Sequence, residues 1–407
     1  MTASSVPMRA LVERAVGGGW GLDAHEVGTE QVAVIRGADF PAVAHGDTSR
    51  VPVRWEAARK IPQRKLQVGD IILEISGGTS ERPTGRTVFV SERLLDGFSH
   101  DVIPASFCRL VRIDKELADP HYVYWWLQGM YAEERTWSYQ NRSTGIANFQ
   151  FEHFLDTEKV RLPDRQIQRE VAATLGALDD KIASNRRAQS LIEALVRSRF
   201  DQLFDVSQDP TGVPISDLVH VNPRRSLPRG SNATYVGMSS LPEFAAEIYE
   251  WETKVYGSGQ KFINGDVLMA RITPCLENGK TAVVDMLDPD EVGWGSTEYI
   301  VLGPRGLIST AWIYCLVRHE SVREFAIRGM TGTSGRQRFA ASNLDDYKIS
   351  PPIESALAEF NDASQPLFDR MKQLRDENLA LASTRDAILP DLLSGNILPR
   401  STDGVRA

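Results

Sequence analysis

Four short segments carry the side chains that donate hydrogen bonds to nucleic acids, set among glycines and prolines. Two lie in the first half of the chain and two in the second. Their candidate residues are Ser76, Thr79, Arg82, Thr84 and Arg86; Arg142, Thr144 and Asn148; Arg271, Thr273, Asn278 and Lys280; and Ser334, Arg336, Gln337 and Arg338. Arginine and asparagine can make paired hydrogen bonds to guanine and adenine edges, and lysine can bind phosphates. The segments are candidate DNA-binding loops; the alternative is ordinary exposed turns with polar side chains.

Catalytic chemistry has weaker support. Pro163-Asp164 followed by Asp179-Asp180-Lys181 loosely fits a nuclease pattern, in which carboxylates hold a metal beside a lysine. Its second part, however, falls within a helical pattern. The segment Asn222-Pro223-Arg224-Arg225 lacks the second proline and the aromatic residue of a methyltransferase motif. Seven histidines and three cysteines show no metal-ligand spacing, so we expect no metal and no catalytic residue.

Composition indicates a multidomain protein of the cytoplasm. The 407 residues are too many for one compact core, so two to four domains are expected. No apolar run is long enough to span a bilayer, and we see no signal peptide at the start. The three scattered cysteines fit a reducing compartment. A net charge of −8 is weak evidence against DNA binding, because attraction depends on a local basic face.

A repeat organises the chain into two similar halves. Each half contains a Gly-Asp turn before an apolar strand, at positions 69–70 and 265–266. Each later has a short segment ending at a proline, Val160-Arg161-Leu162-Pro163 or Ile349-Ser350-Pro351-Pro352, which a long helical segment follows. Short β-type runs at 31–35, 70–75, 87–90, 266–272 and 281–284 predict substantial sheets, with helices at 120–131 and 309–328. We therefore predict two α+β domains, each with a β-rich core and each followed by a long helix.

The two long helices carry coiled-coil heptads. Mostly apolar residues, with polar interruptions at Asn185, Gln189 and Asn378, alternate at spacings of three and four along each helix. The predicted seam residues are Val171, Leu175, Leu178, Ile182, Asn185, Gln189, Ile192 and Val196 in the first helix, and Leu357, Phe360, Leu367, Met371, Leu374, Asn378, Leu381, Ile388 and Leu392 in the second. We expect an antiparallel pair within the chain; pairing with a partner's helix is the alternative. Such a rod, roughly 50 Å long, would set the separation of two half-sites on DNA.

Several motifs resemble those of type I restriction–modification specificity subunits. The segment from Leu162-Pro163-Asp164 through Leu178-Asp179-Asp180-Lys181-Ile182 is similar to the family's central conserved region, and Leu389-Pro390-Asp391-Leu392 to its final helix. Residues 271–282, 293–298 and 331–338 look like stretches of its target recognition domains. The match covers nearly the whole chain. The second helix departs from the pattern, because Pro351-Pro352-Ile353-Glu354 lacks the usual Glu-Gln step.

The resemblance implies a non-catalytic chain that reads a bipartite, asymmetric DNA site. Its boundaries would be 1–160 and 206–350 for the recognition domains, 161–205 and 351–397 for the spacer helices, and 398–407 for a tail. The spacers would bind two methyltransferase subunits, with restriction subunits joining them, and S-adenosylmethionine, ATP and Mg²⁺ would belong to those partners. The alternatives are a coiled-coil protein–protein adaptor without DNA specificity and, less favoured, a self-sufficient nuclease.

Overall fold

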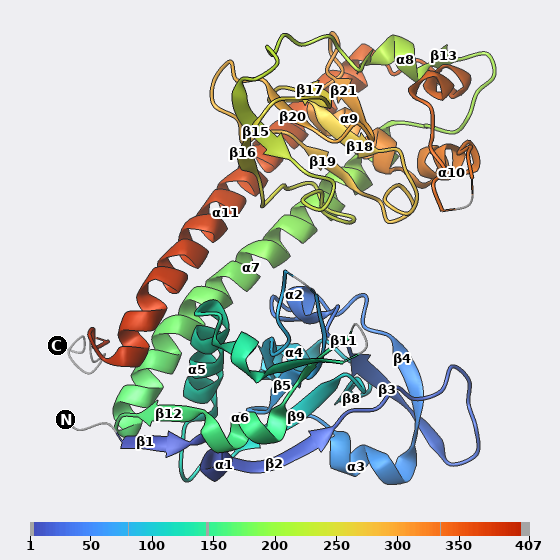
Figure 1. Ribbon diagram of the computed structural model, residues 1–407. Helices are drawn as coiled ribbons and strands as arrows, with labels where there is room; N and C mark the ends of the chain where they lie inside the picture. Colours follow the sequence, from blue (N-terminus) through green and yellow to red (C-terminus); the bar gives the residue numbers. More distant parts are fainter. Residues whose placement is uncertain (1–3, 80, 144–145, 334, 400–407) are drawn as a thin grey trace, which may run out of the picture. The chain divides into compact units, whose positions relative to one another are not determined.

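The computed structural model describes residues 4–79, 81–143, 146–333 and 335–399, and its fold is mixed α and β, as predicted (Figure 1). The chain divides into two compact units. Unit 1 comprises Met1–Ser184 with Ala380–Ala407, and unit 2 is Asn185–Leu379. Each unit therefore holds one β-rich domain together with part of each long helix. In the described part of the chain, no helix is long and apolar enough to cross a membrane.

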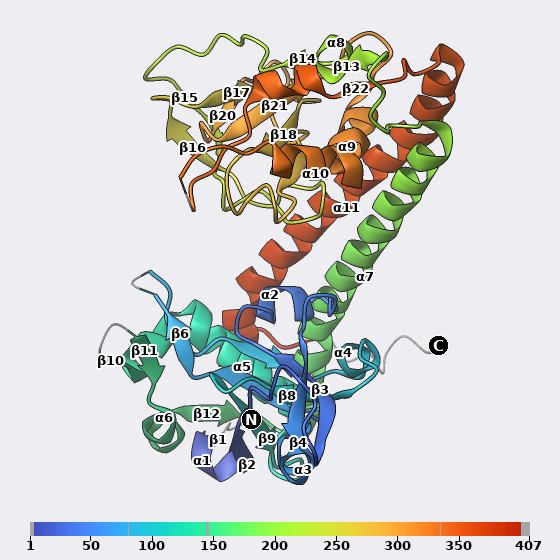
Figure 2. The same cartoon turned by 90° about the vertical axis from the view of Figure 1, so that its right-hand side faces the viewer.

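The two long helices are α7, Arg165–Leu203, and α11, Glu354–Ser394. They have 39 and 41 residues and lie side by side in both views (Figures 1 and 2). The Asp164 carboxylate caps the start of α7 by accepting a hydrogen bond from the Ile167 N–H at 2.9 Å. Every seam residue predicted from the heptads is buried or half-buried.

The helices pack antiparallel, as expected for two such helices in one chain, each preceded by a domain of similar size. In unit 1 the beginning of α7 meets the end of α11, with Leu175 and Leu389 in one apolar cluster. In unit 2 the end of α7 meets the beginning of α11, where the rings of Phe200 and Phe360 lie 5.8 Å apart. Both clusters continue into the adjoining domain. The helices are thus part of each domain's core and do not stand apart from it.

The first domain, which is the part of unit 1 outside the long helices, is built on two main sheets. One has the order β2-β9-β5-β7, all antiparallel, and the other β4-β3-β8, in which β3 and β8 are parallel. Smaller sheets pair β1 with β12 and join β10, β11 and β6. The strands are β1 Ser4–Pro7, β2 Val12–Gly17, β3 Thr29–Ile35, β4 Val53–Ala57, β5 Ile71–Glu74, β6 Ser76–Gly78, β7 Thr87–Phe89, β8 Asp101–Pro104, β9 Cys108–Ile113, β10 Gln140–Ser143, β11 Ile146–Phe149 and β12 Lys159–Leu162.

The predicted helix at 120–131 is confirmed as α5, Pro120–Ala132, which packs against this domain's first sheet. Asp119 caps it by accepting from the His121 and Tyr122 N–H groups. The shorter helices of the domain are α1 Met8–Leu11, α2 Phe40–Val43, α3 Ile61–Arg64, α4 Glu92–Asp96 and α6 Phe151–Thr157.

The second domain, the part of unit 2 outside the long helices, repeats the two main sheets of the first, with one additional strand, β17, in its second sheet. Its first sheet, β14-β21-β18-β19, is antiparallel throughout, and its second, β16-β15-β20-β17, contains the parallel pair β15 and β20. Strands β13 and β22 pair as β1 and β12 do. The strands are β13 Val213–Pro214, β14 His220–Val221, β15 Asn232–Val236, β16 Glu252–Val255, β17 Gln260–Phe262, β18 Val267–Ala270, β19 Thr281–Val283, β20 Gly293–Gly295, β21 Tyr299–Gly303 and β22 Lys348–Ile349, beside the short helix α8 Ile215–Leu218.

The two Gly-Asp turns have the same geometry. Gly69 and Gly265 have φ of +96° and +91°, values that favour glycine. The carboxylate of Asp70 accepts from the Gln67 N–H at 2.7 Å, and that of Asp266 from the Ile263 N–H at 2.9 Å. Each aspartate is held by an arginine, Arg112 or Arg225. The repeat read in the sequence is therefore a repeat of structure.

The single helix predicted at 309–328 is wrong in one respect. It is two helices, α9 Thr310–Arg318 and α10 Glu320–Arg328, separated at His319, whose φ and ψ are −64° and 140°. The Ser321 hydroxyl lies 2.6 Å from the His319 ring nitrogen Nδ1. All of α9 except Thr310 is buried, whereas α10 buries only one face. The break lets the two helices turn these different faces to the core.

Candidate nucleic-acid interface

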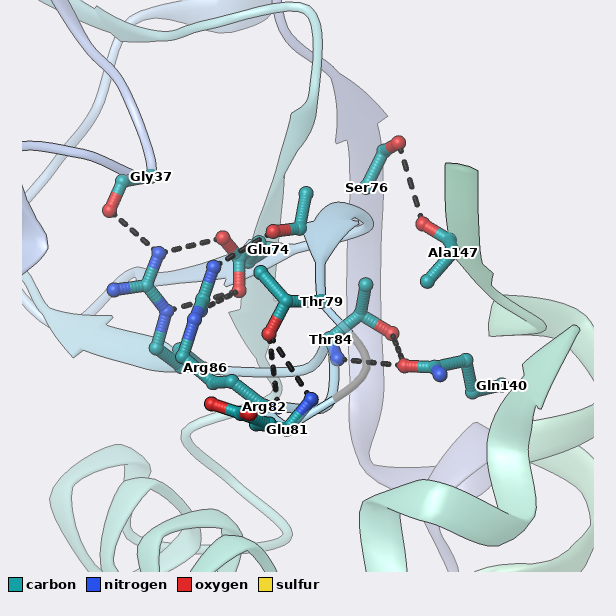
Figure 3. A network of polar contacts seen from close by, with 11 residues as sticks. Gly37, Glu74, Ser76, Thr79, Glu81, Arg82, Thr84, Arg86, Gln140 and Ala147 are labelled. Atoms are coloured by element: carbon teal, nitrogen blue, oxygen red, sulfur yellow. Dashed lines mark hydrogen bonds and ion pairs between the residues drawn. The ribbon is translucent and has the colours of Figure 1, made fainter. Parts of the chain in front are cut away.

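In the first domain, two arginines converge on one buried carboxylate at the end of β5. Arg86 donates from Nε and Nη2 to Glu74 at 2.9 and 2.6 Å, and Arg82 Nη1 donates to it at 3.1 Å (Figure 3). Arg86 also donates to the Gly37 carbonyl at 2.7 Å. Burial opposes the charge of Arg86, but the hydrogen bond and charge of Glu74 outweigh it and raise the pKa of the guanidinium. The loop between β5 and β7 is thus held by charge-assisted bonds.

The hydroxyl-bearing residues of this loop have structural roles. The Thr79 hydroxyl accepts from the N–H groups of Glu81 and Arg82, which closes a tight turn. Thr84 is completely buried, with its N–H and hydroxyl bonded to the Gln140 side chain at 2.9 and 3.3 Å. Thr84 is therefore enclosed by protein, whereas the sequence predicted an exposed loop residue. Its burial shapes the loop instead.

The sheet β10-β11-β6 brings together the two candidate segments of the first domain. Asn148 of β11 pairs with Ser76 of β6, and the Ser76 hydroxyl donates to the Ala147 carbonyl at 3.4 Å (Figure 3). Asn148 is exposed. Arg142 lies in β10, next to these strands. Thr144 is outside the described residues.

In the second domain, two arginines again converge on one carboxylate. Glu298 accepts from Arg338 Nε at 2.9 Å and from Arg271 Nε at 3.2 Å. The side chains of Arg271, Arg338 and Glu298 are 31%, 42% and 19% exposed. The hydrogen bond from Arg338 is the main reason that the pKa of Glu298 is lowered, and the bond raises the pKa of Arg338.

Backbone bridges join the two candidate segments of this domain as well. Arg338 forms isolated bridges with Ile272 and with Thr331. The Thr273 N–H donates to the Gln337 carbonyl at 3.0 Å, and the Phe339 N–H donates to the Arg271 carbonyl at 2.8 Å. Residues about 65 positions apart therefore form one surface at the end of β18, as the equivalent segments do in the first domain.

The other candidate DNA-binding residues of the second domain differ in exposure and in whether their side chains already make hydrogen bonds. Asn278 Nδ2 donates to Glu243 at 3.1 Å, and Lys280 Nζ donates to the Met238 carbonyl at 2.9 Å. Both side chains are partly exposed. To bind DNA, each would have to share its present hydrogen bond with the ligand or break it. Arg336 is exposed and Gln337 is half-exposed. Ser334 lies outside the described residues.

The sequence reading missed the two carboxylates. Glu74 and Glu298 lie at the same end of the central strand pair of their sheets. Glu74 is the last residue of β5 and pairs with Cys108, the first residue of β9. Glu298 directly precedes Tyr299, the first residue of β21, which pairs with Ala270, the last residue of β18. Each cluster combines two guanidinium groups with one carboxylate, so each keeps one net positive charge. Acidic residues are not expected to bind DNA, because they repel phosphates. The signal present in the sequence was one glutamate next to a strand end in each half of the repeat.

The carboxylates of the nuclease-like pattern are already engaged. Asp164 caps α7, Asp179 pairs with Arg385 at 2.5 Å, and Asp180 pairs with Arg93 at 3.0 Å. Among the residues that the structure describes, no group of three or more His, Cys, Asp or Glu could hold a metal ion. The pattern is explained by helix capping and by ion pairs along α7.

The arrangement defines a class of protein with two like α+β domains joined through an antiparallel helix pair. A solved structure with this fold is the type I restriction–modification S subunit of M. genitalium, with a TM-score of 0.53, 12% identity and 96% of each chain covered. No protein-family model matches the chain. The similarity in fold extends over the whole chain, although few residues are shared.

Sequence comparison points to the same class. The type I restriction enzyme EcoEI specificity subunit of Escherichia coli is 23% identical over 203 residues, 48% of this chain and 34% of that protein. The EcoAI specificity subunit of Escherichia coli is 30% identical over 110 residues, 26% of this chain and 18% of that protein. The matches thus span about a third or less of these relatives. The chain resembles type I restriction specificity subunits, as its motifs predicted.

Proposed function

We propose that this chain is the DNA-reading subunit of a type I restriction–modification complex and recognises a bipartite, asymmetric site. The observation that carries the proposal is the pair of arginine–carboxylate clusters, Glu74 with Arg82 and Arg86, and Glu298 with Arg271 and Arg338. They occupy matching ends of the first main sheet, β2-β9-β5-β7 and β14-β21-β18-β19, whose strand order is the same in both domains. Each domain would read one half of the site, and the two halves would differ because the loops differ in sequence.

The contact residues proposed for the first domain are Ser76, Thr79, Arg82, Arg86, Arg142, Thr144 and Asn148. Those for the second are Arg271, Thr273, Asn278, Lys280, Ser334, Arg336, Gln337 and Arg338. Most of the arginines and the asparagines would bind base edges, while Arg336, the lysine and the loop backbone would bind phosphates. Thr84 is left out of the set because it is buried.

The long helices would serve as the scaffold for the partner proteins. We expect two methyltransferase subunits to bind them, and restriction subunits to join the assembly. The chain itself would have no catalytic activity, and S-adenosylmethionine, ATP and Mg²⁺ would be bound by the partners. We expect a protein with this role to be located in the cytoplasm.

Helix length would set the gap between the half-sites. Both α7 and α11 run without a break through both units. Inserting one heptad into each helix, in register, would add roughly 10 Å, or about three base pairs of B-DNA. The unspecified gap in the recognised motif should lengthen accordingly.

The test is methylome sequencing of cells with and without the gene, followed by binding of the purified methyltransferase complex to the motif found. We expect one bipartite motif to lose methylation, and binding that weakens steeply with salt because phosphate contacts release counterions. A complex that prefers no duplex over another would overturn the proposal. It would favour the adaptor function, in which the helix pair binds proteins and the domains read peptides.

A further inference from the structure

Arg271 is the only member of the two clusters that joins its carboxylate through Nε alone. Within the described residues, its two terminal Nη groups make no hydrogen bond or ion pair. Arg86 uses Nε and Nη2, Arg82 uses both Nη groups, and Arg338 uses Nε and both Nη groups. The free end of Arg271 is a flat fork of four N–H donors on a side chain that is 31% exposed.

The backbone of Arg271 is fixed on both sides. Its N–H donates to the Glu298 carbonyl at 3.0 Å, and its carbonyl accepts from the Phe339 N–H at 2.8 Å. Glu298 itself is held by Arg338, whose Nη2 lies 2.8 Å from Oε1. Backbone and side chain of Arg271 are therefore oriented before any ligand arrives, which reduces the entropy that binding must cost.

The charge balance favours a base over a phosphate as the ligand. Glu298 neutralises part of the charge of Arg271 but leaves its hydrogen-bond donors in place. A phosphate is attracted mainly by net charge, whereas the N7 and O6 atoms of guanine are neutral acceptors that match a planar fork. A fixed, partly neutralised guanidinium is thus better suited to a guanine edge than to the DNA backbone.

On this basis we propose that Arg271 reads a guanine in the half-site of the second domain, and that Glu298 is the positioning residue that orients it. The inference rests on the proposed function, since it specifies one base that the proposed interface recognises. It also predicts that Arg271 and Glu298 determine the base preference at a single position of the motif, because one guanidinium group can bind the edge of one guanine.

The experiment uses the complex with its methyltransferase partner and a set of duplexes in which each motif position is substituted in turn. We expect Glu298→Gln and Arg271→Lys each to reduce the preference for guanine at one shared position by roughly 5- to 150-fold, with the other positions unaffected. The slope of binding against salt should stay as in the unaltered complex. Arg271→Lys keeps the charge and removes only the fork, so it reports on geometry even if Glu298→Gln loosens the loop.

Glu324→Gln is the matched control. It removes a carboxylate from another arginine pair of the same domain, that of Arg328 and Glu324 at 3.0 Å, which is exposed on α10. It should leave every position unchanged. Uniform weakening at all positions in Arg271→Lys, with no position losing its preference for guanine, would indicate a contact other than a guanine edge and overturn the inference. So would unchanged base preference in both variants. If the unaltered complex prefers no sequence, it is the proposed function that fails.

Discussion

Asn185 on α7 and Asn378 on α11 share a hydrogen bond in the seam of unit 2, with Nδ2 of the first 3.0 Å from Oδ1 of the second. Asn378 Nδ2 in turn donates to the Tyr249 hydroxyl at 3.2 Å, and that hydroxyl donates to Gln189 Oε1 at 2.7 Å. Tyr249 belongs to the second domain. Since a displaced register would break all three bonds, the network fixes the alignment of the helices with each other and with this domain.

Replacing either asparagine by leucine should therefore destabilise unit 2. The remaining asparagine would lose one hydrogen bond in a buried seam and keep its other, Asn185 to Glu377 or Asn378 to Tyr249, at a cost of about 0.5–1.5 kcal/mol. In the double variant the two costs should not add, and the coupling should be about 0.5–3 kcal/mol. Denaturant unfolding of the four proteins measures the cycle. Ser190→Ala, on the exposed face of α7, is the control and should change stability by less than about 0.5 kcal/mol.

Phe360→Ala should be among the most damaging single substitutions in unit 2. The Phe360 ring is fully buried and lies 5.8 and 5.6 Å from the rings of Phe200 and Phe204, so it joins α11 to the end of α7 and to the second domain's core. Removing such a ring costs about 3–5 kcal/mol. Calorimetry checks this. Leu191→Ala, whose side chain is 62% exposed, should unfold close to the temperature of the unaltered chain; equal effects of the two would contradict the packing described.

The stability of unit 2 should fall between about pH 4.5 and pH 8 because of Glu247. Burial, and then the charge of Glu193, raise the pKa of this carboxyl from 4.5 to about 8, and no described residue gives Oε1 a hydrogen bond. Below the unfolded value both states are protonated, and no stability is lost. As the pH rises, the unfolded chain releases its proton first, which favours unfolding until the folded carboxyl ionises near pH 8.

Glu247→Gln removes this ionisation and should be more stable than the unaltered chain at pH 8, on the order of 2–5 kcal/mol. The difference should shrink toward pH 5. Unfolding at several pH values measures it. A gain of the same size at pH 5 and pH 8 would show that the substitution acts through packing, and titration of Glu247 would then not explain it.

Arg336→Ala should weaken DNA binding equally at all sequences, on the proposed function. Arg336 is exposed beside the Glu298 cluster, and no carboxylate of the described residues pairs with it, so its full charge is available to a phosphate. Loss of one phosphate contact lowers the salt slope by about one. The measurement is binding at several salt concentrations. A loss of preference at a single base would instead assign Arg336 to base reading.

The sequence was sufficient for the architecture because its strongest signals are periodic or repeated. The heptads of α7 and α11 identify the side of each helix that is buried. A pattern sustained over that many residues is compatible with few structures other than paired helices. The Gly-Asp turns at 69–70 and 265–266 mark the same strand in both domains because a positive φ followed by a capping aspartate is a local requirement. Both kinds of signal are present within a short window of residues.

The site was less predictable because it depends on contacts between distant residues. Whether an arginine is free or paired is decided by the glutamate that folding brings to it, as with Arg271 and Glu298. Thr84 reads as an exposed loop residue, yet it is buried against Gln140, which comes from another segment. Likewise, the break at His319 contains no proline or glycine; it reflects the two helices' different burial in the core.

The core of the first domain is completed by Leu389, Leu392 and Leu393 of α11, and Arg161 donates to the Leu393 carbonyl at 3.1 Å. Unit 2, by contrast, is a single continuous stretch, Asn185–Leu379. Unit 1 is therefore closed by contacts between residues far apart in the chain, 232 positions for Arg161 and Leu393, whereas unit 2 is built from one stretch. Because contacts between distant residues must be closed before they stabilise a domain, we expect unit 2 to fold faster than unit 1.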